Sequence, residues 1–147
     1  MTYQHQIQDV EELLIASMRD RFEPGNLAHT AMALSGQVWE FLRSHHEIPQ
    51  PGTNVWVYPG DGIVEAGAQV LAPFKSDGPV LCSSTPAGRA VVTTHWGPYD
   101  KIPEAYDSFR AWAADQNLQL AGPSWEVYGH WNEDPAKLRT DIFHLLA

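Results

Sequence analysis

Apolar residues recur at spacings of three and four in two segments of the chain, which is the pattern of an amphipathic helix. The first segment covers residues 26–46 and follows a Glu-Pro-Gly-Asn turn at residues 23–26. The second covers residues 101–117, where Asp100 can cap the helix and Pro103 falls in its first turn. The apolar stripe of this second helix, which we assign to the core, consists of Ile102, Tyr106, Phe109, Trp112 and Ala113.

Seven short runs rich in β-forming residues are separated by Gly and Pro, and they predict strands. These runs cover residues 13–19, 54–58, 64–71, 80–85, 89–96, 124–128 and 141–146. In chain order, the predicted elements give β-α-β-β and then β-β-α-β-β. This order indicates two copies of one structural unit.

Residue spacings support a repeat. Tyr58 ends a Trp-Val-Tyr sequence after the first helix, and Tyr128 ends a Glu-Val-Tyr sequence after the second, 70 residues later. The upstream strands that begin at Leu13 and Ala90 lie 77 residues apart. The difference between the two spacings is explained by the longer first helix.

A unit with one helix and a few strands cannot bury its sheet alone, so two such units are expected to pack together. The sequence therefore predicts one α+β domain over residues 1–147, built as a pseudo-twofold tandem repeat of β-α-β-β units at about residues 1–75 and 76–147. Two long helices would pack on an antiparallel sheet. A central cleft between the halves would be a natural ligand site.

The 147 residues carry 9 Lys and Arg against 18 Asp and Glu, which gives a formal charge of −9. Such an acidic surface repels phosphate backbones and anionic lipids, so we expect no direct nucleic-acid or membrane partner. A cationic ligand or a basic protein partner would suit this field, although the charge can also serve solubility alone. The N-terminal residues do not resemble a signal peptide, and no apolar run approaches the ~20 residues that span a bilayer. A cytoplasmic protein is the expectation.

Common catalytic signatures are absent from the sequence: it has no nucleophile elbow, phosphate-binding glycine loop or dinucleotide fingerprint. Seven histidines are scattered along the chain, and we predict neither a metal site nor a cofactor. His95 lies in a predicted strand and is expected to be a hydrogen-bonded structural residue. Cys82 is the only cysteine, so no intramolecular disulfide forms, and we expect its thiol to be inert.

The aromatic stretch at residues 124–131 contains one acid, Glu126. Side chains alternate along a strand, so Glu126 shares a face with Tyr128 and opposes its immediate neighbours. A buried carboxylate needs a partner, because desolvating an unpaired charge is expensive. Glu126 is therefore a candidate receptor for a ligand cation, or else it pairs with Arg89 or Arg139 and the aromatic residues belong to the core.

The repeat adds a second argument for a ligand site. The half-turn that superimposes the two units places Trp56 where Glu126 lies and Tyr58 where Tyr128 lies. If both strands border the central cleft, these four residues line it. An acid in an aromatic pocket suits a flat, hydrophobic and often cationic molecule, because aromatic faces attract cations.

Several motifs together resemble the GyrI-like small-molecule-binding domain, which also forms the effector-binding domain of multidrug-responsive transcription activators. The resemblance extends over nearly the whole chain. Its motifs are residues 57–59, 65–67, 85–88, 94–99, 122–128, 134–135 and 140–142. It implies a tandem α+β repeat around a central groove, in agreement with the prediction above.

The resemblance also implies site residues. The pocket glutamate of the family corresponds to Glu126, and the pocket aromatic residues correspond to Trp56, Tyr58, Trp96, Tyr99 and Tyr128. No helix-turn-helix precedes the first predicted strand, which indicates the stand-alone form of the domain.

Stand-alone relatives suggest three activities. Some sequester drug-like or toxic compounds, and some hydrolyse cyclopropanoid DNA-alkylating compounds. In a hydrolase, Glu126 would be the general base for a water, and Tyr58 or Tyr128 would donate to the developing oxyanion. The namesake modulates DNA gyrase, which makes an acidic inhibitor of that enzyme the third possibility.

Overall fold

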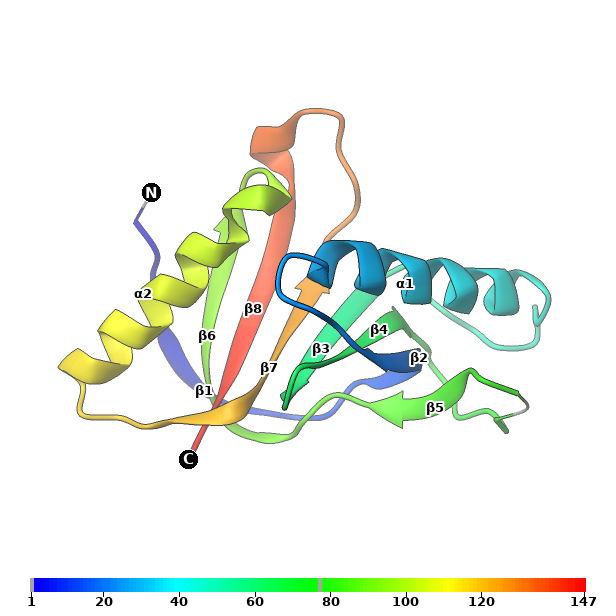
Figure 1. Cartoon of the computed structure of the whole chain (residues 1–147), viewed down its shortest axis with the longest axis horizontal. Helices are drawn as coiled ribbons and strands as arrows, with labels where there is room; N and C mark the ends of the chain where they lie inside the picture. The colour runs from blue at the N-terminus through cyan, green and yellow to red at the C-terminus, as the bar shows by residue number, and fades with distance from the viewer. Residues whose placement is uncertain (1, 77) are drawn as a thin grey trace.

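A computed structural model describes residues 2–76 and 78–147 as one eight-stranded antiparallel sheet with two helices (Figure 1). The helices are α1 (Leu27–Arg43) and α2 (Ile102–Asp115), with short 3-10 turns η1 (Tyr99–Lys101) and η2 (Pro135–Lys137). The strands are β1 (Gln6–Val10), β2 (Leu14–Arg21), β3 (Asn54–Gly60), β4 (Ile63–Gln69), β5 (Leu81–Ser84), β6 (Gly88–Trp96), β7 (Leu120–Tyr128) and β8 (Arg139–Leu146). The α+β class predicted from the sequence is confirmed.

Strand β1 is absent from the sequence-based prediction. It pairs antiparallel with β6, with Gln6 opposite Val92, and it forms one edge of the sheet. Four of its five residues are exposed. An edge strand with both faces in water has no alternation of apolar and polar residues, so periodicity cannot detect it.

The strand order in the sheet is β1-β6-β8-β7-β3-β4-β2-β5. The two halves of this order correspond when each is followed from its own edge to the centre: β1 corresponds to β5, β6 to β2, β8 to β4 and β7 to β3. The two halves also exchange edge strands, because β1 pairs with β6 and β5 pairs with β2. At the centre, β3 pairs with β7, and Trp56 lies directly opposite Glu126. The exact bounds of the two repeats, near residue 75, stay a prediction.

Both helices cover the same face of the sheet, which we call the inner face (Figure 1). Helix α1 packs Ala31 and Leu34 against Val64 and Ala66 of β4. Helix α2 packs its own apolar residues, among them Phe109, against β6 and β8. The two helices therefore bury separate cores on the two wings of the sheet, and the central strands β3 and β7 lie between them.

The opposite, outer face of the sheet has a core of its own. Trp125 is 2% exposed and stacks on Phe143, with ring centroids 5.3 Å apart. The loops that precede β2 and β6 are joined by hydrogen bonds between Leu13 and Thr85. Within the described ranges, neither helix is long and apolar enough to cross a membrane.

Candidate functional site

A cavity of about 1140 Å³ lies between α1 and α2, above the central strands β3 and β7. The gap between the two separate cores explains its position, since neither helix covers the middle of the inner face. The Phe, Tyr and Trp side chains in its lining are Phe22, Trp56, Tyr58, Tyr99, Tyr106, Tyr128 and Trp131.

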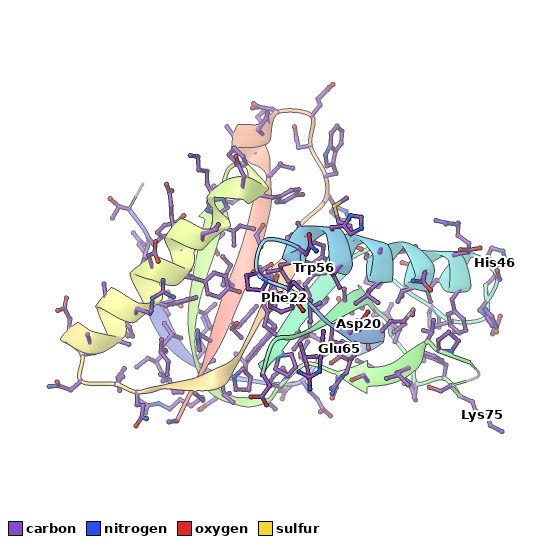
Figure 2. All side chains as sticks on the ribbon, in the orientation of Figure 1. Asp20, Phe22, His46, Trp56, Glu65 and Lys75 are labelled. Atoms are coloured by element: carbon purple, nitrogen blue, oxygen red, sulfur yellow. The ribbon has the colours of Figure 1, made fainter. Side chains whose placement is uncertain are left out.

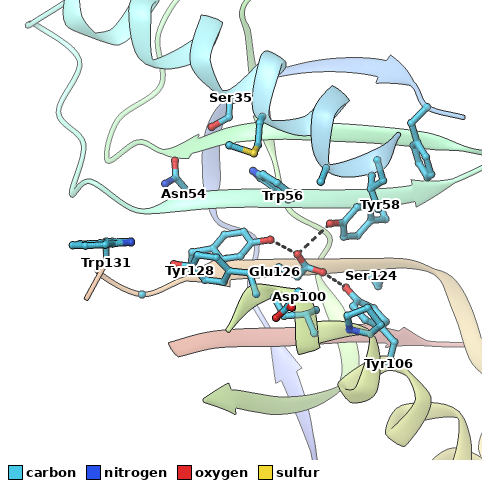
Figure 3. A pocket seen from close by; sticks show the side chains of 18 of the residues that line it. Ser35, Asn54, Trp56, Tyr58, Asp100, Tyr106, Ser124, Glu126, Tyr128 and Trp131 are labelled. Carbon is cyan, nitrogen blue, oxygen red and sulfur yellow. Dashed lines mark hydrogen bonds between the residues drawn. The ribbon is translucent and has the colours of Figure 1, made fainter. Parts of the chain in front are cut away.

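Glu126 lies at the centre of the cavity floor and is only 3% exposed. Three tyrosine hydroxyls donate hydrogen bonds to its carboxylate (Figure 3). Tyr58 donates to Oε1 at 3.1 Å and Tyr106 donates to Oε2 at 2.7 Å. Tyr128 also donates to Oε1. We call this arrangement the tyrosine cage.

The members of the cage come from three different elements. Tyr128 lies two residues after Glu126 on β7, so strand alternation places both on the inner face. Tyr58 lies on β3, two residues after Trp56, and Tyr106 comes from α2. Trp56 packs edge-on against Tyr128, with ring centroids 5.4 Å apart, and this contact restricts the tyrosine ring.

Burial raises the pKa of Glu126, because the cavity floor is poorly solvated. The hydrogen bonds from the tyrosine cage and the nearby His95 act in the opposite direction and stabilise the carboxylate. Burial and the Glu126 charge also raise the pKa of each caging tyrosine, so all three remain hydrogen-bond donors at neutral pH. The carboxylate is therefore solvated by neutral hydroxyl groups.

The alternative in which an arginine neutralises Glu126 is wrong. Arg139 donates instead to Asp141, at 3.0 Å from Nε to Oδ1. Arg89 lies on an exposed part of β6, and within residues 2–76 and 78–147 no ion pair involves it or Glu126.

Five of the six predicted site residues line the cavity together: Trp56, Tyr58, Tyr99, Glu126 and Tyr128. Trp96 does not. Its neighbour His95 is opposite Thr140, which in turn is opposite Tyr128, so His95 shares the inner face with Tyr128. Alternation then directs Trp96 to the outer face, where it is half-exposed and 5.6 Å from the Arg139 guanidinium.

His95 is buried and hydrogen-bonded, as the sequence predicts. Its Nε2 lies 2.9 Å from the Pro98 carbonyl oxygen, which can only accept, so Nε2 is the donor. Its Nδ1 lies 2.8 Å from the Tyr3 hydroxyl. No three His, Cys, Asp or Glu side chains in the described part of the chain are grouped in a way that would hold a metal ion.

Tyr106 packs against the α2 core beside Phe109, as the apolar stripe predicts, but its hydroxyl also reaches the cavity. The apolar stripe alone does not predict this second contact. A tyrosine at a buried helical position needs a partner for its hydroxyl, and this is the signal that distinguishes it from the neighbouring Phe109. In the structure that partner is Glu126.

Comparison with protein families shows that the model of the GyrI-like small molecule binding domain matches residues 3–146. The chain belongs to this family. A comparison with curated proteins found no match.

Solved structures with the same fold include the C-terminal domain of EcmrR, at 23% identity and a TM-score of 0.79, covering 100% of this chain and 99% of that one. In the EcmrR–DNA complex, the match at 19% identity and a TM-score of 0.82 covers 98% of this chain but 57% of EcmrR. This chain therefore spans little more than half of that longer protein.

Two more distant structures show the same fold. A hydrolase from Listeria innocua is 10% identical with a TM-score of 0.63, covering 98% of this chain and 92% of that one. SAV2435 bound to tetraphenylphosphonium is 13% identical with a TM-score of 0.61, covering 98% of this chain and 94% of that one.

Proposed function

We propose that this protein binds hydrophobic aromatic cations in the cavity between α1 and α2, with Glu126 as the charge partner. The observation that carries this proposal is a buried carboxylate, open to a large aromatic cavity, that has neutral partners only. Since Glu126 takes part in no ion pair among the described residues, a bound cation would supply a direct countercharge.

The chemistry of the cavity favours large cations of low charge density. Such ions lose little hydration energy on entry, whereas a small, strongly hydrated ion would lose a great deal. Aromatic faces attract a cation by about 0.5–2 kcal/mol each, depending on desolvation. Glu126 already accepts three hydrogen bonds, so a cation without hydrogen-bond donors suits this carboxylate.

Two other features support a cationic ligand. The chain carries a formal charge of −9, and Asp100 adds a carboxylate at the cavity lining. SAV2435, which shares the fold, binds tetraphenylphosphonium. That ion is an aromatic cation without hydrogen-bond donors, and it is a suitable first probe for this chain.

Tetraphenylphosphonium and tetraphenylborate have nearly the same shape and opposite charge, so their comparison isolates the electrostatic term. Binding is measured by quenching of tryptophan fluorescence, because Trp56 and Trp131 line the cavity. The wild-type protein should bind the phosphonium and discriminate strongly against the borate. Glu126→Gln keeps the size of the side chain and should weaken phosphonium binding by roughly tenfold or more, since a contact with a charged group is worth about 1.5–3 kcal/mol.

An equal affinity for both ions, or an unchanged affinity in Glu126→Gln, would refute the role of Glu126. Far-UV circular dichroism and the unfolding midpoint of the variant serve as the control for folding. Tyr99→Phe is the matched cavity control, because Tyr99 lines the same cavity and donates no hydrogen bond to Glu126.

Hydrolysis of a cyclopropanoid compound is the second candidate function. The supporting observation is the raised pKa of Glu126, which is typical of a general base. The Tyr128 hydroxyl donates its single proton to Glu126, so it would turn to a developing oxyanion only as Glu126 takes up the proton of the attacking water. Incubation with a cyclopropanoid alkylator should then yield a hydrated, ring-opened product over many turnovers, and Glu126→Gln should abolish it. Stoichiometric retention of intact compound would support binding alone.

A further inference from the structure

The amide of Asn54 has a fixed orientation at the edge of the cavity. Trp39 of α1 donates a hydrogen bond from its indole Nε1 to Asn54 Oδ1, at 2.6 Å. An indole nitrogen can only donate, so the amide atom that faces it must be the oxygen. The Asn54 NH₂ group therefore points away from Trp39.

Among the side-chain hydrogen bonds of the described residues, Asn54 takes part only as an acceptor. Its NH₂ group has no partner there. Asn54 is partly buried and lines the cavity. In Figure 3 it lies on β3 beside Trp56, on the side of the cavity where Trp131 lies. The cavity thus contains a fixed and unused hydrogen-bond donor.

The position of this donor relative to Glu126 follows from the strand register. Trp56 lies directly opposite Glu126, and Asn54 lies two residues before Trp56 on the same face of β3. Diagonal neighbours of this kind on paired strands are roughly 7–8 Å apart. The cavity floor therefore presents a negative charge and a neutral donor at a short, defined spacing.

We propose that Asn54 forms a second, polar subsite, and that the protein selects hydrophobic cations that also carry a hydrogen-bond acceptor, such as a carbonyl oxygen, a short distance from the charge. This inference rests on the proposed function, because it places the cation next to Glu126. It narrows the ligand class from aromatic cations in general to bifunctional ones.

The bond from Trp39 makes the subsite effective, because a pre-oriented amide loses little freedom when a ligand binds. A ligand with a carbonyl oxygen at this position replaces the water that otherwise solvates the NH₂ group. A purely hydrocarbon ligand that reaches the same position removes this water and leaves the donor unpaired, which is unfavourable. Selectivity therefore arises both from the hydrogen bond that a carbonyl ligand gains and from the unpaired donor that a hydrocarbon ligand leaves.

Alkyltriphenylphosphonium ions test this prediction. Each ion with a terminal methyl ketone is compared with the hydrocarbon ion of matched length and branching, over short, intermediate and long linkers. At the linker length that reaches Asn54, the ketone should bind roughly two- to tenfold more tightly than its hydrocarbon counterpart, which corresponds to one neutral hydrogen bond. At the other lengths the difference should disappear.

Two variants link the preference to the amide. Asn54→Asp keeps an oxygen for Trp39 and replaces the donor with a second oxygen, so the ketone preference should vanish or reverse while both cations still bind. Trp39→Phe leaves Asn54 in place but allows its amide to rotate, so the preference should become smaller. Because the readout is a ratio of two affinities, general weakening of the cavity does not imitate either result.

The outcomes separate this inference from the proposed function. If phosphonium ions bind but ketone and hydrocarbon bind equally at every length, or if the preference survives in Asn54→Asp, the Asn54 subsite is refuted and cation binding stands. If no phosphonium ion binds at all, both the proposed function and this inference are refuted.

Discussion

Two glutamates are almost fully buried in this protein, and they are compensated in different ways. Glu65 on β4 is 1% exposed and Glu126 on β7 is 3% exposed. Glu65 accepts a hydrogen bond from the Ser17 hydroxyl and forms an ion pair with Arg19, at 2.9–3.0 Å from the guanidinium nitrogens. Glu126 accepts hydrogen bonds from three tyrosines, and none of the ion pairs within residues 2–76 and 78–147 involves it.

The location of each glutamate in the sheet explains this difference. Trp56 pairs with Ala66, which packs against α1, so strand alternation directs the neighbouring Glu65 to the outer face. Figure 2 shows Trp56 closer to α1 and Glu65 farther from it. On the outer face the chain itself supplies the countercharge, and no cavity is needed. On the inner face no ion pair of the described residues involves Glu126, and a cavity opens above it, as the proposed binding of a cation requires.

The largest expected effect is on stability and concerns Glu65. Arg19→Met should reduce the free energy of unfolding by roughly 2–4 kcal/mol, because the buried carboxylate then loses its cationic partner. The exposure of the Arg19 side chain, 51%, admits some water and moderates the loss. Denaturant unfolding measures this difference.

The double variant Arg19→Met, Glu65→Gln tests the mechanism behind that loss. Gln still accepts from Ser17 but carries no charge, so the double variant should be more stable than Arg19→Met alone. Tetraphenylphosphonium affinity should stay unchanged in both, because Glu65 lies on the outer face. A loss of binding in either variant would contradict the separation of structural and binding carboxylates.

The next effect is on the pH dependence of binding and concerns Glu126. Its pKa is raised above the ordinary 4.5, so a fraction of the protein carries a protonated Glu126 at pH values above 4.5. Tetraphenylphosphonium does not titrate, so its affinity should rise with pH as Glu126 ionises and level off once the raised pKa is passed. In that window, binding should release protons, which calorimetry in buffers of different ionisation enthalpy detects.

The effect of pH on folding stability is opposite to its effect on cation affinity. A raised pKa in the folded state means that the folded protein binds more protons than the unfolded chain, so stability falls as pH rises through the folded pKa. Glu126→Gln should flatten both profiles, for affinity and for stability. A wild-type binding profile that is flat above pH 4.5, or one that persists in the Gln variant, would contradict this assignment.

A smaller effect is expected from single members of the tyrosine cage. Tyr106→Phe removes one donor to Glu126, which should raise the pKa of the carboxyl further and move the binding profile to higher pH. At neutral pH the affinity for a cation should fall by roughly two- to tenfold. Tyr99→Phe is the matched control, and its binding profile should overlay that of the wild type.

The sequence predicts the fold well where burial is one-sided. Helix periodicity and runs of β-forming residues locate both helices and seven of the strands. The 70-residue spacing between Tyr58 and Tyr128 agrees with their shared place in the cavity, where they donate to the same oxygen of Glu126. Strand β1 has no such pattern, since its backbone pairing with β6 holds it at an exposed edge. Periodicity detects buried faces and is uninformative for strands that have none.

The site was predictable from strand alternation but not from helix periodicity. Alternation correctly grouped Glu126 with Tyr128, and Trp56 with Tyr58. Alternation places His95 and Trp96 on opposite faces, but only the register of β6, β8 and β7 shows that His95 faces the cavity and Trp96, which the family resemblance assigns to the pocket, does not. Tyr106 and Asn54 depend on contacts between α2 or α1 and the sheet, which a single sequence does not contain.

The smallest expected effect concerns Trp96 and extends the comparison to a third carboxylate. On the outer face Asp141 accepts from Arg139, whose guanidinium also lies 5.6 Å from the Trp96 ring, so this acid, like Glu65, has its own cation. Trp96→Phe should therefore leave tetraphenylphosphonium affinity unchanged and lower the free energy of unfolding by no more than about 0.5–1 kcal/mol, the size of an exposed cation–π contact. Trp56→Phe is the matched variant on the inner face and should weaken binding, because its ring contacts Tyr128 and lines the cavity. If Trp96→Phe weakened binding as much as Trp56→Phe, then the outer face would take part in ligand binding, and the division between the two faces of the sheet would be wrong.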